Sequence, residues 1–318
     1  MKEKDLSTKE RKKEKIRSNL ENSTEEINDN WKDVNETYAE KTWCSGCSNF
    51  AILAATKKAL TELAKEGNIK LKNIVVVVGI GCHAKIYDYL ELSSYYALHG
   101  RVLPSLLGIK LGNPELIPIG FAGDGDTYAE GMNHFIHSCK RNVNIKLFVH
   151  NNKVFALTTG QVTPTSEKGF IGSTTPFGNY EKPLNPILIA LVSGATFVAR
   201  AYALDVEHLA KIMKEAILHK GFAFIDILQP CITYHNTISY FSQRIYKLED
   251  VAHNQKSFED AMKKALEWDY SLSQDAKIPI GIFYKVEKET FEDTLPWSKE
   301  PFWKIERKFK KEIIEEFR

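Results

Sequence analysis

The fold is decided by residues 117–152, which read IPIGFAGDGDTYAEGMNHFIHSCKRNVNIKLFVHNN. Apolar runs at 117–122 and 145–150 flank a Gly-Asp-Gly sequence, at 123–125, and an amphipathic run. This order predicts a strand, an acidic turn, a helix, a second strand and an Asn-Asn turn, which together form a βαβ unit. Open parallel sheets bind ligands at the carboxyl ends of their strands. We therefore expect the acidic turn and the Asn-Asn turn to form one binding site.

The polar groups of this unit suit a magnesium ion and a diphosphate. Asp124 and Asn152 offer the hard oxygen ligands that Mg2+ prefers, and the glycines let backbone N–H groups approach phosphate oxygens beside a helix start. Residues 126–150 separate Gly-Asp-Gly from Asn-Asn, a spacing that resembles the thiamine diphosphate motif. On that resemblance Asp124, the Asn152 side chain and the Val154 carbonyl bind Mg2+. A tight turn without a ligand is the alternative for Gly-Asp-Gly taken alone.

The composition narrows the class of protein. The chain has 318 residues, 43% of them apolar, which is enough for one large or two modest domains. Its 43 Lys and Arg residues nearly balance its 41 Asp and Glu residues, so the net charge gives no case for binding nucleic acid or an anionic membrane. No apolar run approaches the roughly 20 residues of a membrane span, and the amino terminus is charged where a secretion signal would be apolar. We expect a cytoplasmic protein whose cysteines stay reduced.

Four of the five cysteines lie in turns at the ends of predicted elements: Cys44, Cys47, Cys82 and Cys231. The first two form a Cys-x-x-Cys turn at the start of a helix. The other two follow the apolar runs at 74–78 and 222–228, which we predict to be strands, the first of them buried on both faces. Cys139 lies on the apolar face of a predicted helix, and we expect it to be a small core residue.

Four such thiolates can bind either zinc or an iron-sulfur cluster, because both accept tetrahedral sulfur ligation. Structural zinc sites more often use two short Cys-x-x-Cys pairs, whereas Cys82 and Cys231 stand alone. The spacing favours the cluster without deciding the matter. A thioredoxin-like redox role for Cys44 and Cys47 is a third option, weakened because no predicted strand precedes them.

Several landmarks of the sequence occur in the same order in one family of enzymes. They are Trp43-Cys-Ser-Gly-Cys47, Gly79-Ile-Gly-Cys82, His99-Gly-Arg101, Gly108-Ile-Lys110, the Gly123 to Asn152 unit, Thr159-Gly-Gln161 with Pro164-Thr165, Phe197 to Arg200 and Pro230 to Thr233. Over roughly residues 42–290 the chain resembles the beta subunits of 2-oxoacid:ferredoxin oxidoreductases. The resemblance implies a thiamine diphosphate-binding fold, an α/β architecture with a mostly parallel sheet and helices on both faces.

The same resemblance implies ligands for each cofactor. One 4Fe-4S cluster would be bound by Cys44, Cys47, Cys82 and Cys231. Thiamine diphosphate would lie against Ile80, Gly81, Cys82, His83, His99, Gly123, Gly125, Asp126, Ala156 and Leu157. Lys85 is our candidate for binding the substrate carboxylate, because a compact cation near the cofactor would bind an oxoacid. The alternative for Lys85 is an exposed lysine that binds no substrate, and the alternative for His99 is an ordinary surface histidine.

The reaction that the resemblance implies is the oxidative decarboxylation of a 2-oxoacid, pyruvate or 2-oxoglutarate, to an acyl-coenzyme A and CO2. Thiamine diphosphate is the electron sink of this reaction, and the cluster passes electrons one at a time to ferredoxin. The carboxylating direction is also conceivable with such low-potential acceptors. A non-oxidative thiamine diphosphate decarboxylase and a zinc-stabilised subunit without catalytic activity are the alternative functions.

One group that thiamine diphosphate needs is missing from the predicted unit. A carboxylate must bond to the aminopyrimidine ring, and in this fold a second domain of similar architecture supplies it. The chain has one such unit, so we expect it to be inactive without a partner alpha subunit. Four positions depart from the family pattern and put the hydrogen bonding around the cluster in doubt: Ser45, Ser48, Gln229 and His235.

Three regions are predicted along the chain. Residues 1–38 are dense in charged and amide side chains and form a flexible arm, or dock on a partner. Residues 39–240 form the domain that binds thiamine diphosphate, Mg2+ and the cluster. Residues 241–318 form a carboxyl-terminal extension with charged helices at 257–268 and 301–317. Its aromatic residues suit contact with another subunit, although they equally suit covering the sheet.

Overall fold

The computed structural model describes residues 37–295 and 298–305. The arm predicted at 1–38 lies almost entirely outside the described residues, and so does most of the helix predicted at 301–317. In the described part of the chain, no helix is both long and apolar enough to cross a lipid bilayer.

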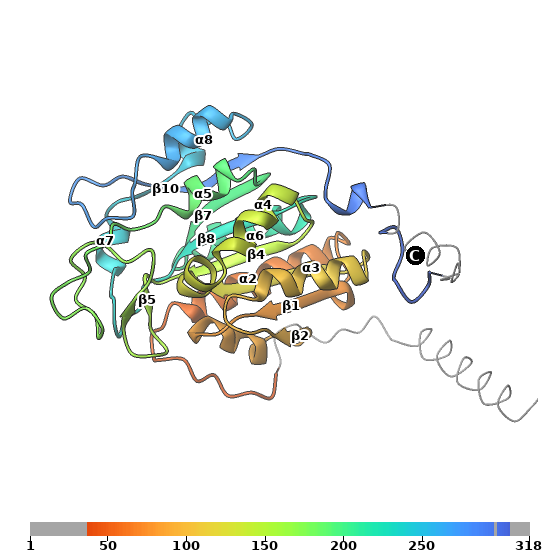
Figure 1. The fold of residues 1–318 in the computed structure, drawn as a ribbon. Coiled ribbons are helices and arrows are strands. Elements are labelled where there is room, and N and C mark those ends of the chain that lie inside the picture. The colour runs from red at the N-terminus through yellow and green to blue at the C-terminus, as the bar shows by residue number, and fades with distance from the viewer. Residues whose placement is uncertain (1–36, 296–297, 306–318) are drawn as a thin grey trace, which may run out of the picture. The chain divides into compact units, whose positions relative to one another are not determined.

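An eight-stranded sheet organises the described residues (Figure 1). Its strands lie in the order β2, β1, β3, β4, β8, β7, β10, β9, with the bounds Ser93–Tyr96, Ile74–Val78, Ile117–Gly123, Lys146–Asn151, Ala223–Leu228, Phe197–Tyr202, Ile278–Lys285 and Ile245–Lys247. Every neighbouring pair is parallel except β7 with β10. The mostly parallel α/β sheet that the sequence predicts is confirmed.

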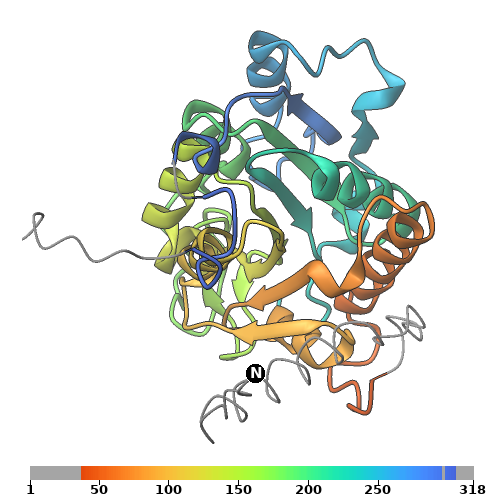
Figure 2. The same cartoon turned by 90° about the vertical axis from the view of Figure 1, so that its right-hand side faces the viewer.

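Helices cover both faces of the sheet, which explains why its central strands are apolar on both sides (Figure 2). One face carries α2 (Asn49–Lys65) and α6 (Val206–Leu218), which pack on each other. The other face carries α3 (Val102–Gly112), α4 (Met132–Arg141), α5 (Pro186–Val192) and α8 (Phe258–Ala265). A smaller third cluster packs α7 (Ile238–Ser242) against Trp268 and Tyr270.

The region predicted as a carboxyl-terminal extension takes part in the main sheet. β10 pairs with β7, and β9 pairs with β10 at the sheet edge. Helix α8 (Phe258–Ala265) is shorter than the predicted helix at 257–268 and packs against α5. Within the described residues this region is therefore continuous with the core, and its contact with another subunit stays a prediction.

The turn after β3 contains a helical element that the sequence did not predict. Gly125–Glu130 form one turn of π-helix, and α4 begins at Met132. π-helical turns are rare and often occur at functional sites. The wider turn keeps the residues after Asp124 at the sheet edge before the α-helix begins.

Helix α4 turns one side toward the core. Phe135 and Cys139 are fully buried, as expected for Cys139, whereas Ile136 is 38% exposed. The Phe135 ring meets the rings of Tyr128 and Phe224 edge to face. This contact fixes α4 on the sheet directly behind the Asp124 turn.

Truncating Phe135 should therefore be costly. We expect Phe135→Ala to lower the free energy of unfolding by about 3–5 kcal/mol, because a large cavity opens between aromatic rings. Ile136→Ala, one residue further along, should lower it by about 1 kcal/mol or less. Chemical denaturation of the full chain measures both values, and equal losses would contradict the assigned buried face.

Candidate functional site

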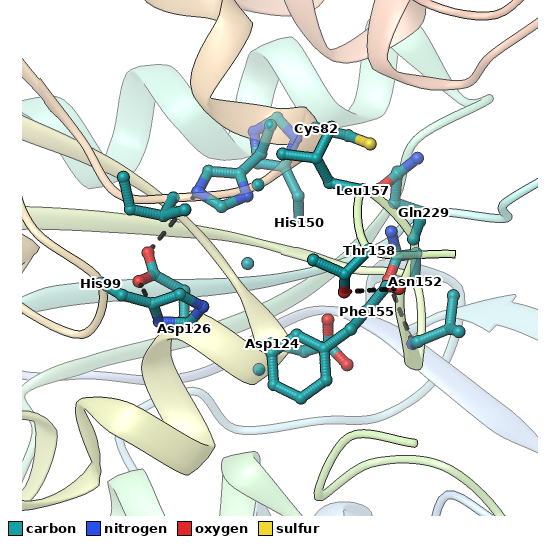
Figure 3. A pocket seen from close by; sticks show the side chains of 17 residues that line it. Cys82, His99, Asp124, Asp126, His150, Asn152, Phe155, Leu157, Thr158 and Gln229 are labelled. Atoms are coloured by element: carbon teal, nitrogen blue, oxygen red, sulfur yellow. Dashed lines mark hydrogen bonds and ion pairs between the residues drawn. The ribbon is translucent and has the colours of Figure 1, made fainter. Parts of the chain in front are cut away.

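A cavity opens at the carboxyl ends of β1, β3 and β4 (Figure 3). Its volume is about 490 Å3 including the part open to solvent. We call it the Asp124 cavity. All residues expected to bind thiamine diphosphate or Mg2+ line it: Ile80, Gly81, Cys82, His83, His99, Gly123, Asp124, Gly125, Asp126, Asn152, Val154, Ala156 and Leu157.

Asp124 is the first residue after β3, and its carboxylate is buried against two threonines. Thr163 Oγ1 donates to Asp124 Oδ2 at 2.5 Å, and Thr165 Oγ1 donates to the same oxygen at 2.8 Å. Burial raises the pKa of Asp124 to about 6, against the effect of these hydrogen bonds. The carboxylate is therefore oriented by the chain itself. The sequence indicated Thr165 as a landmark, but nothing in it indicated Thr163.

The two asparagines at the end of β4 have separate roles. Asn152 lines the cavity, and its Oδ1 accepts the Val154 N–H at 3.1 Å. Asn151 points into the protein, where its Nδ2 donates to Asp226 Oδ1 at 3.0 Å and its Oδ1 accepts from Thr165 Oγ1 at 2.9 Å. Asn151 therefore supports the turn from inside the protein, whereas Asn152 lines the cavity.

Asp126 holds two histidines at the cavity. Its Oδ1 accepts the Gly100 N–H at 2.6 Å and lies 3.1 Å from His99 Nδ1, and its Oδ2 lies 3.5 Å from His83 Nε2. Burial acts to raise the pKa of Asp126, but the histidines outweigh it and hold that pKa well below its usual range. A Cβ added at Gly79 would lie 1.6 Å from Asp126 Oδ2. The Asp126 side chain, and not just its backbone, therefore shapes the cavity wall.

An aromatic ring packs against Gly125. Phe155 lies on a short hairpin of β5 (Val154–Phe155) and β6 (Gln161–Val162), beside Asp124 in the cavity (Figure 3). A Cβ added at Gly125 would lie 2.1 Å from the Phe155 ring. From the sequence we expect Gly125 to let the backbone approach a phosphate. The structure adds a steric reason for glycine at this position, because a side chain would collide with the Phe155 ring.

A second cavity, about 670 Å3 with its open part, adjoins the first, and we call it the thiol cavity. The four cysteines predicted to bind a cluster all line it as free thiols: Cys44, Cys47, Cys82 and Cys231. Burial, followed by the neighbouring Cys231 and Cys47, raises the pKa of the Cys82 thiol to about 11. Across residues 37–295 and 298–305, no three His, Cys, Asp or Glu side chains stand close enough together to hold a metal ion. The thiols therefore share one cavity without closing on a common point.

Hydrogen bonds fasten the cysteine-bearing segments to one another. Trp43 Nε1 donates to the Cys82 carbonyl at 2.7 Å, and Ser48 Oγ donates to the Pro230 carbonyl at 2.6 Å. Gln229 Nε2 donates to Ser48 Oγ at 3.2 Å. Ser48 and Gln229, which both depart from the family pattern, are therefore bonded to each other.

Lys85 lines the thiol cavity and not the Asp124 cavity. Its Nζ donates to the Thr42 carbonyl at 3.0 Å, and its charge acts to lower the pKa of Cys82 against the larger effect of burial. Its role toward a substrate carboxylate stays a prediction.

The two cavities share a wall. Five residues line both: Cys82, Asn152, Ala156, Leu157 and Gln229. A group in one cavity is therefore separated from a group in the other by single side chains. Gln229, which is buried directly after β8, lines both cavities. The sequence analysis named it only as a departure from the family pattern and not as a site residue.

Family models match two stretches of the chain. Residues 79–227 match the C-terminal TPP binding domain of thiamine pyrophosphate enzymes, and residues 231–300 match the C-terminal region of the pyruvate ferredoxin oxidoreductase beta subunit. The first match contains every residue that lines the Asp124 cavity except Gln229. The second begins at Cys231.

Curated relatives extend over most of the chain. It is 42% identical over 266 residues to subunit beta of 2-oxoacid:ferredoxin oxidoreductase 1 from Aeropyrum pernix, covering 80% of each chain. It is 44% identical over 255 residues to 2-oxoacid:ferredoxin oxidoreductase subunit beta from Saccharolobus solfataricus, covering 77% of this chain and 82% of that one. A solved structure, 2-oxoglutarate:ferredoxin oxidoreductase from Magnetococcus marinus with 2-oxoglutarate, coenzyme A and succinyl-CoA bound, matches with a TM-score of 0.75 at 30% identity, covering 82% of this chain and 89% of that chain.

Replacing glycine by alanine should have opposite effects on the free energy of unfolding at Gly125, which contacts Phe155, and at Gly108, which has open space around it. Gly125→Ala should lower the free energy of unfolding by about 1–3 kcal/mol, because its methyl group meets the ring. Gly108→Ala, in the exposed interior of α3 with nothing within 4 Å of the added Cβ, should raise it by about 0.5–1 kcal/mol. Chemical denaturation of the full chain measures both, and Phe155→Leu should relieve part of the Gly125→Ala loss. A Gly125→Ala chain as stable as the unaltered one would contradict the packing.

Proposed function

The chain belongs to the beta subunits of the 2-oxoacid:ferredoxin oxidoreductases, and on that premise we propose which cofactors its two cavities hold. It is one subunit of an oxidoreductase that works as a complex. We assign thiamine diphosphate with Mg2+ to the Asp124 cavity and one 4Fe-4S cluster to the thiol cavity. Because the relatives are oxidoreductase subunits, the two alternatives raised from the sequence, a non-oxidative decarboxylase and a zinc-stabilised subunit, are not supported.

The donor groups of each cavity fit the group assigned to it. The Asp124 carboxylate, the Asn152 amide and the Val154 carbonyl are the hard oxygen donors that suit Mg2+. Four free thiols with no competing disulfide suit an iron-sulfur cluster. Hydroxyl donors on Asp124 hold it in one orientation, as partners of metal ligands commonly do.

The shared wall is the observation that carries the proposal. When bound, thiamine diphosphate supplies the electron sink for decarboxylation, and the cluster takes up electrons singly. Cys82 lines both cavities, which supports a cluster ligand that would lie next to the cofactor. We propose a 2-oxoacid, pyruvate or 2-oxoglutarate, as substrate, coenzyme A as acyl acceptor and ferredoxin as electron acceptor. The ligands of the Magnetococcus marinus relative support the first two.

In this proposal a partner alpha subunit supplies the rest of the site. Among the described residues that line the Asp124 cavity, the carboxylates are Asp124 and Asp126, and both are engaged by side chains of this chain. A further carboxylate for the aminopyrimidine ring must then come from another subunit. Exposed apolar side chains support such a contact: Leu157, which lines the cavity, is 49% exposed, and Leu98, next to His99 in the sequence, is 77% exposed.

The remaining assignments rest on the same proposal. Residues 39–240 bind the cofactors, and residues 241–318 contact the partner besides adding β9 and β10 to the sheet. Trp303, which is 70% exposed, is one candidate contact. The five free cysteines agree with a cytoplasmic location.

Removing the Asp124 charge tests the proposed function. In the assembled complex, Asp124→Asn should weaken Mg2+-dependent thiamine diphosphate binding by more than about 10-fold, since outer partners of metal ligands alone contribute 10- to 100-fold. It should abolish oxoacid- and coenzyme A-dependent dye reduction. Asp88→Asn, an exposed aspartate outside both cavities, is the matched control and should keep both properties. Undiminished cofactor binding by Asp124→Asn would refute the assignment.

The cluster assignment predicts a difference between two buried cysteines. Cys231→Ala should lose the cluster, so that iron and sulfide fall well below about four atoms each per subunit. Cys139→Ala, in the core between α4 and the sheet, should retain them. Iron and sulfide analysis of the complex, purified anaerobically with its partner, measures both. Retention of iron by Cys231→Ala, or stoichiometric zinc in the unaltered complex, would overturn the assignment.

A further inference from the structure

The segment Thr163–Glu167 contacts two loops that bear proposed ligands: the turn from Asn152 to Val154 and the loop of Cys231. Thr163 and Thr165 bond to Asp124, as described above. Ser166 Oγ donates to the Lys153 carbonyl at 2.6 Å, in the turn between Asn152 and Val154. The segment therefore supports Asp124 and the turn from Asn152 to Val154, which bear the proposed Mg2+ ligands.

Lys153 makes this turn unusual. It lies between Asn152 and Val154, two of the three proposed Mg2+ ligands, has a left-handed φ of 60° and is 1% exposed. Its Nζ donates to the Tyr270 carbonyl at 2.6 Å and lies 3.1 Å from Glu167 Oε2. A lysine buried so completely needs an anionic partner, and Glu167 is that partner. The position of Glu167 therefore limits where the turn can move.

The other oxygen of the same carboxylate reaches the loop of Cys231. Glu167 Oε1 lies 2.7 Å from His235 Nε2. His235 and Cys231 are paired through their backbones, with the His235 N–H donating to the Cys231 carbonyl at 2.9 Å and the Cys231 N–H donating to the His235 carbonyl at 3.2 Å. The Phe170 ring packs against His235 with its centroid 4.8 Å away. Fixing His235 therefore fixes the backbone of Cys231.

We propose that Glu167 is a positioning residue that ties the Asn152–Val154 turn to the Cys231 loop, so that the thiamine diphosphate site and the cluster site hold each other in place. One carboxylate contacts Lys153 through one oxygen and His235 through the other. Displacement of the Asn152–Val154 turn would leave the buried Lys153 charge without its anionic partner, which is costly, and displacement of the Cys231 loop would take His235 away from Glu167 Oε1. The inference rests on the proposed function, because it takes the two cavities as cofactor sites.

The test uses the complex assembled with its partner under anaerobic conditions. Two quantities are measured: the Mg2+ concentration that gives half-maximal thiamine diphosphate binding, and the half-life of the cluster absorbance after a chelator is added. We expect Glu167→Gln to raise the first about 10-fold or more and to shorten the second several-fold. Saturating thiamine diphosphate with Mg2+ should lengthen the half-life in the unaltered complex but not in Glu167→Gln.

A matched control is Glu249→Gln, which removes the carboxylate from a second histidine pair. Glu249 Oε1 lies 3.2 Å from His208 Nε2, and neither residue lines either cavity. This variant should leave both quantities within about twofold, as expected for a substitution distant from the sites. Thermal unfolding of each complex separates a general loss of stability from the specific loss of cofactors.

Two substitutions at His235 keep the proposal testable if Glu167→Gln fails to fold. His235→Gln retains an amide donor for Glu167 and should preserve the cluster half-life, whereas His235→Leu removes the donor and should shorten it. Equal half-lives in these two variants, or a Glu167→Gln complex with both quantities unchanged, would overturn the inference. An unaltered complex that binds neither iron nor thiamine diphosphate would instead refute the proposed function.

Discussion

The site depends on the register of three parallel strands. β3, β4 and β8 pair so that Gly123 lies opposite His150 and Asn151 lies opposite Leu228. The turns that follow these strands therefore leave the sheet at one level, and the Gln229 N–H bonds to the Asn151 carbonyl at 2.9 Å. A slip of one residue in either pairing would turn every side chain of the strand to the opposite face. Asp124, Asn152 and the loop of Cys231 would then no longer lie together at one edge of the sheet.

Buried charges behind this edge are held by a network of partners. Asp226 Oδ1 accepts the Tyr128 hydroxyl at 2.8 Å, and its Oδ2 accepts the Tyr270 hydroxyl at 2.6 Å. Burial raises the pKa of Asp226, against the effect of these bonds and of Arg200. Because Asp226 also binds Asn151, residues from β7, β8 and the segment before β10 support the turn at the end of β4. Satisfied networks of this kind fix one arrangement of a polar interior.

The sequence predicted four strands of the main sheet, with Asp124 and Asn152, from local signals, whereas the other residues of the Asp124 cavity came from the family resemblance. Apolar runs mark the strands, and the spacing between Asp124 and Asn152 follows from one βαβ unit. The partners of those residues could not be predicted in this way. Thr163 reaches Asp124 and Phe155 reaches Gly125 through the path of a loop that no periodicity describes. The π-helical turn at Gly125–Glu130 has no sequence signature of its own, so the sequence predicted only the α-helix that follows it.

The four thiols differ in their access to solvent. Cys44 is exposed, Cys47 and Cys82 are partly covered, and Cys231 is buried. A cluster held by all four would therefore have an outer corner at Cys44 and an inner corner toward the sheet. An external electron carrier would find its shortest tunnelling route at the outer corner. Dioxygen would reach the iron by that same corner, so the geometry that would speed electron exit would also expose such a cluster to air.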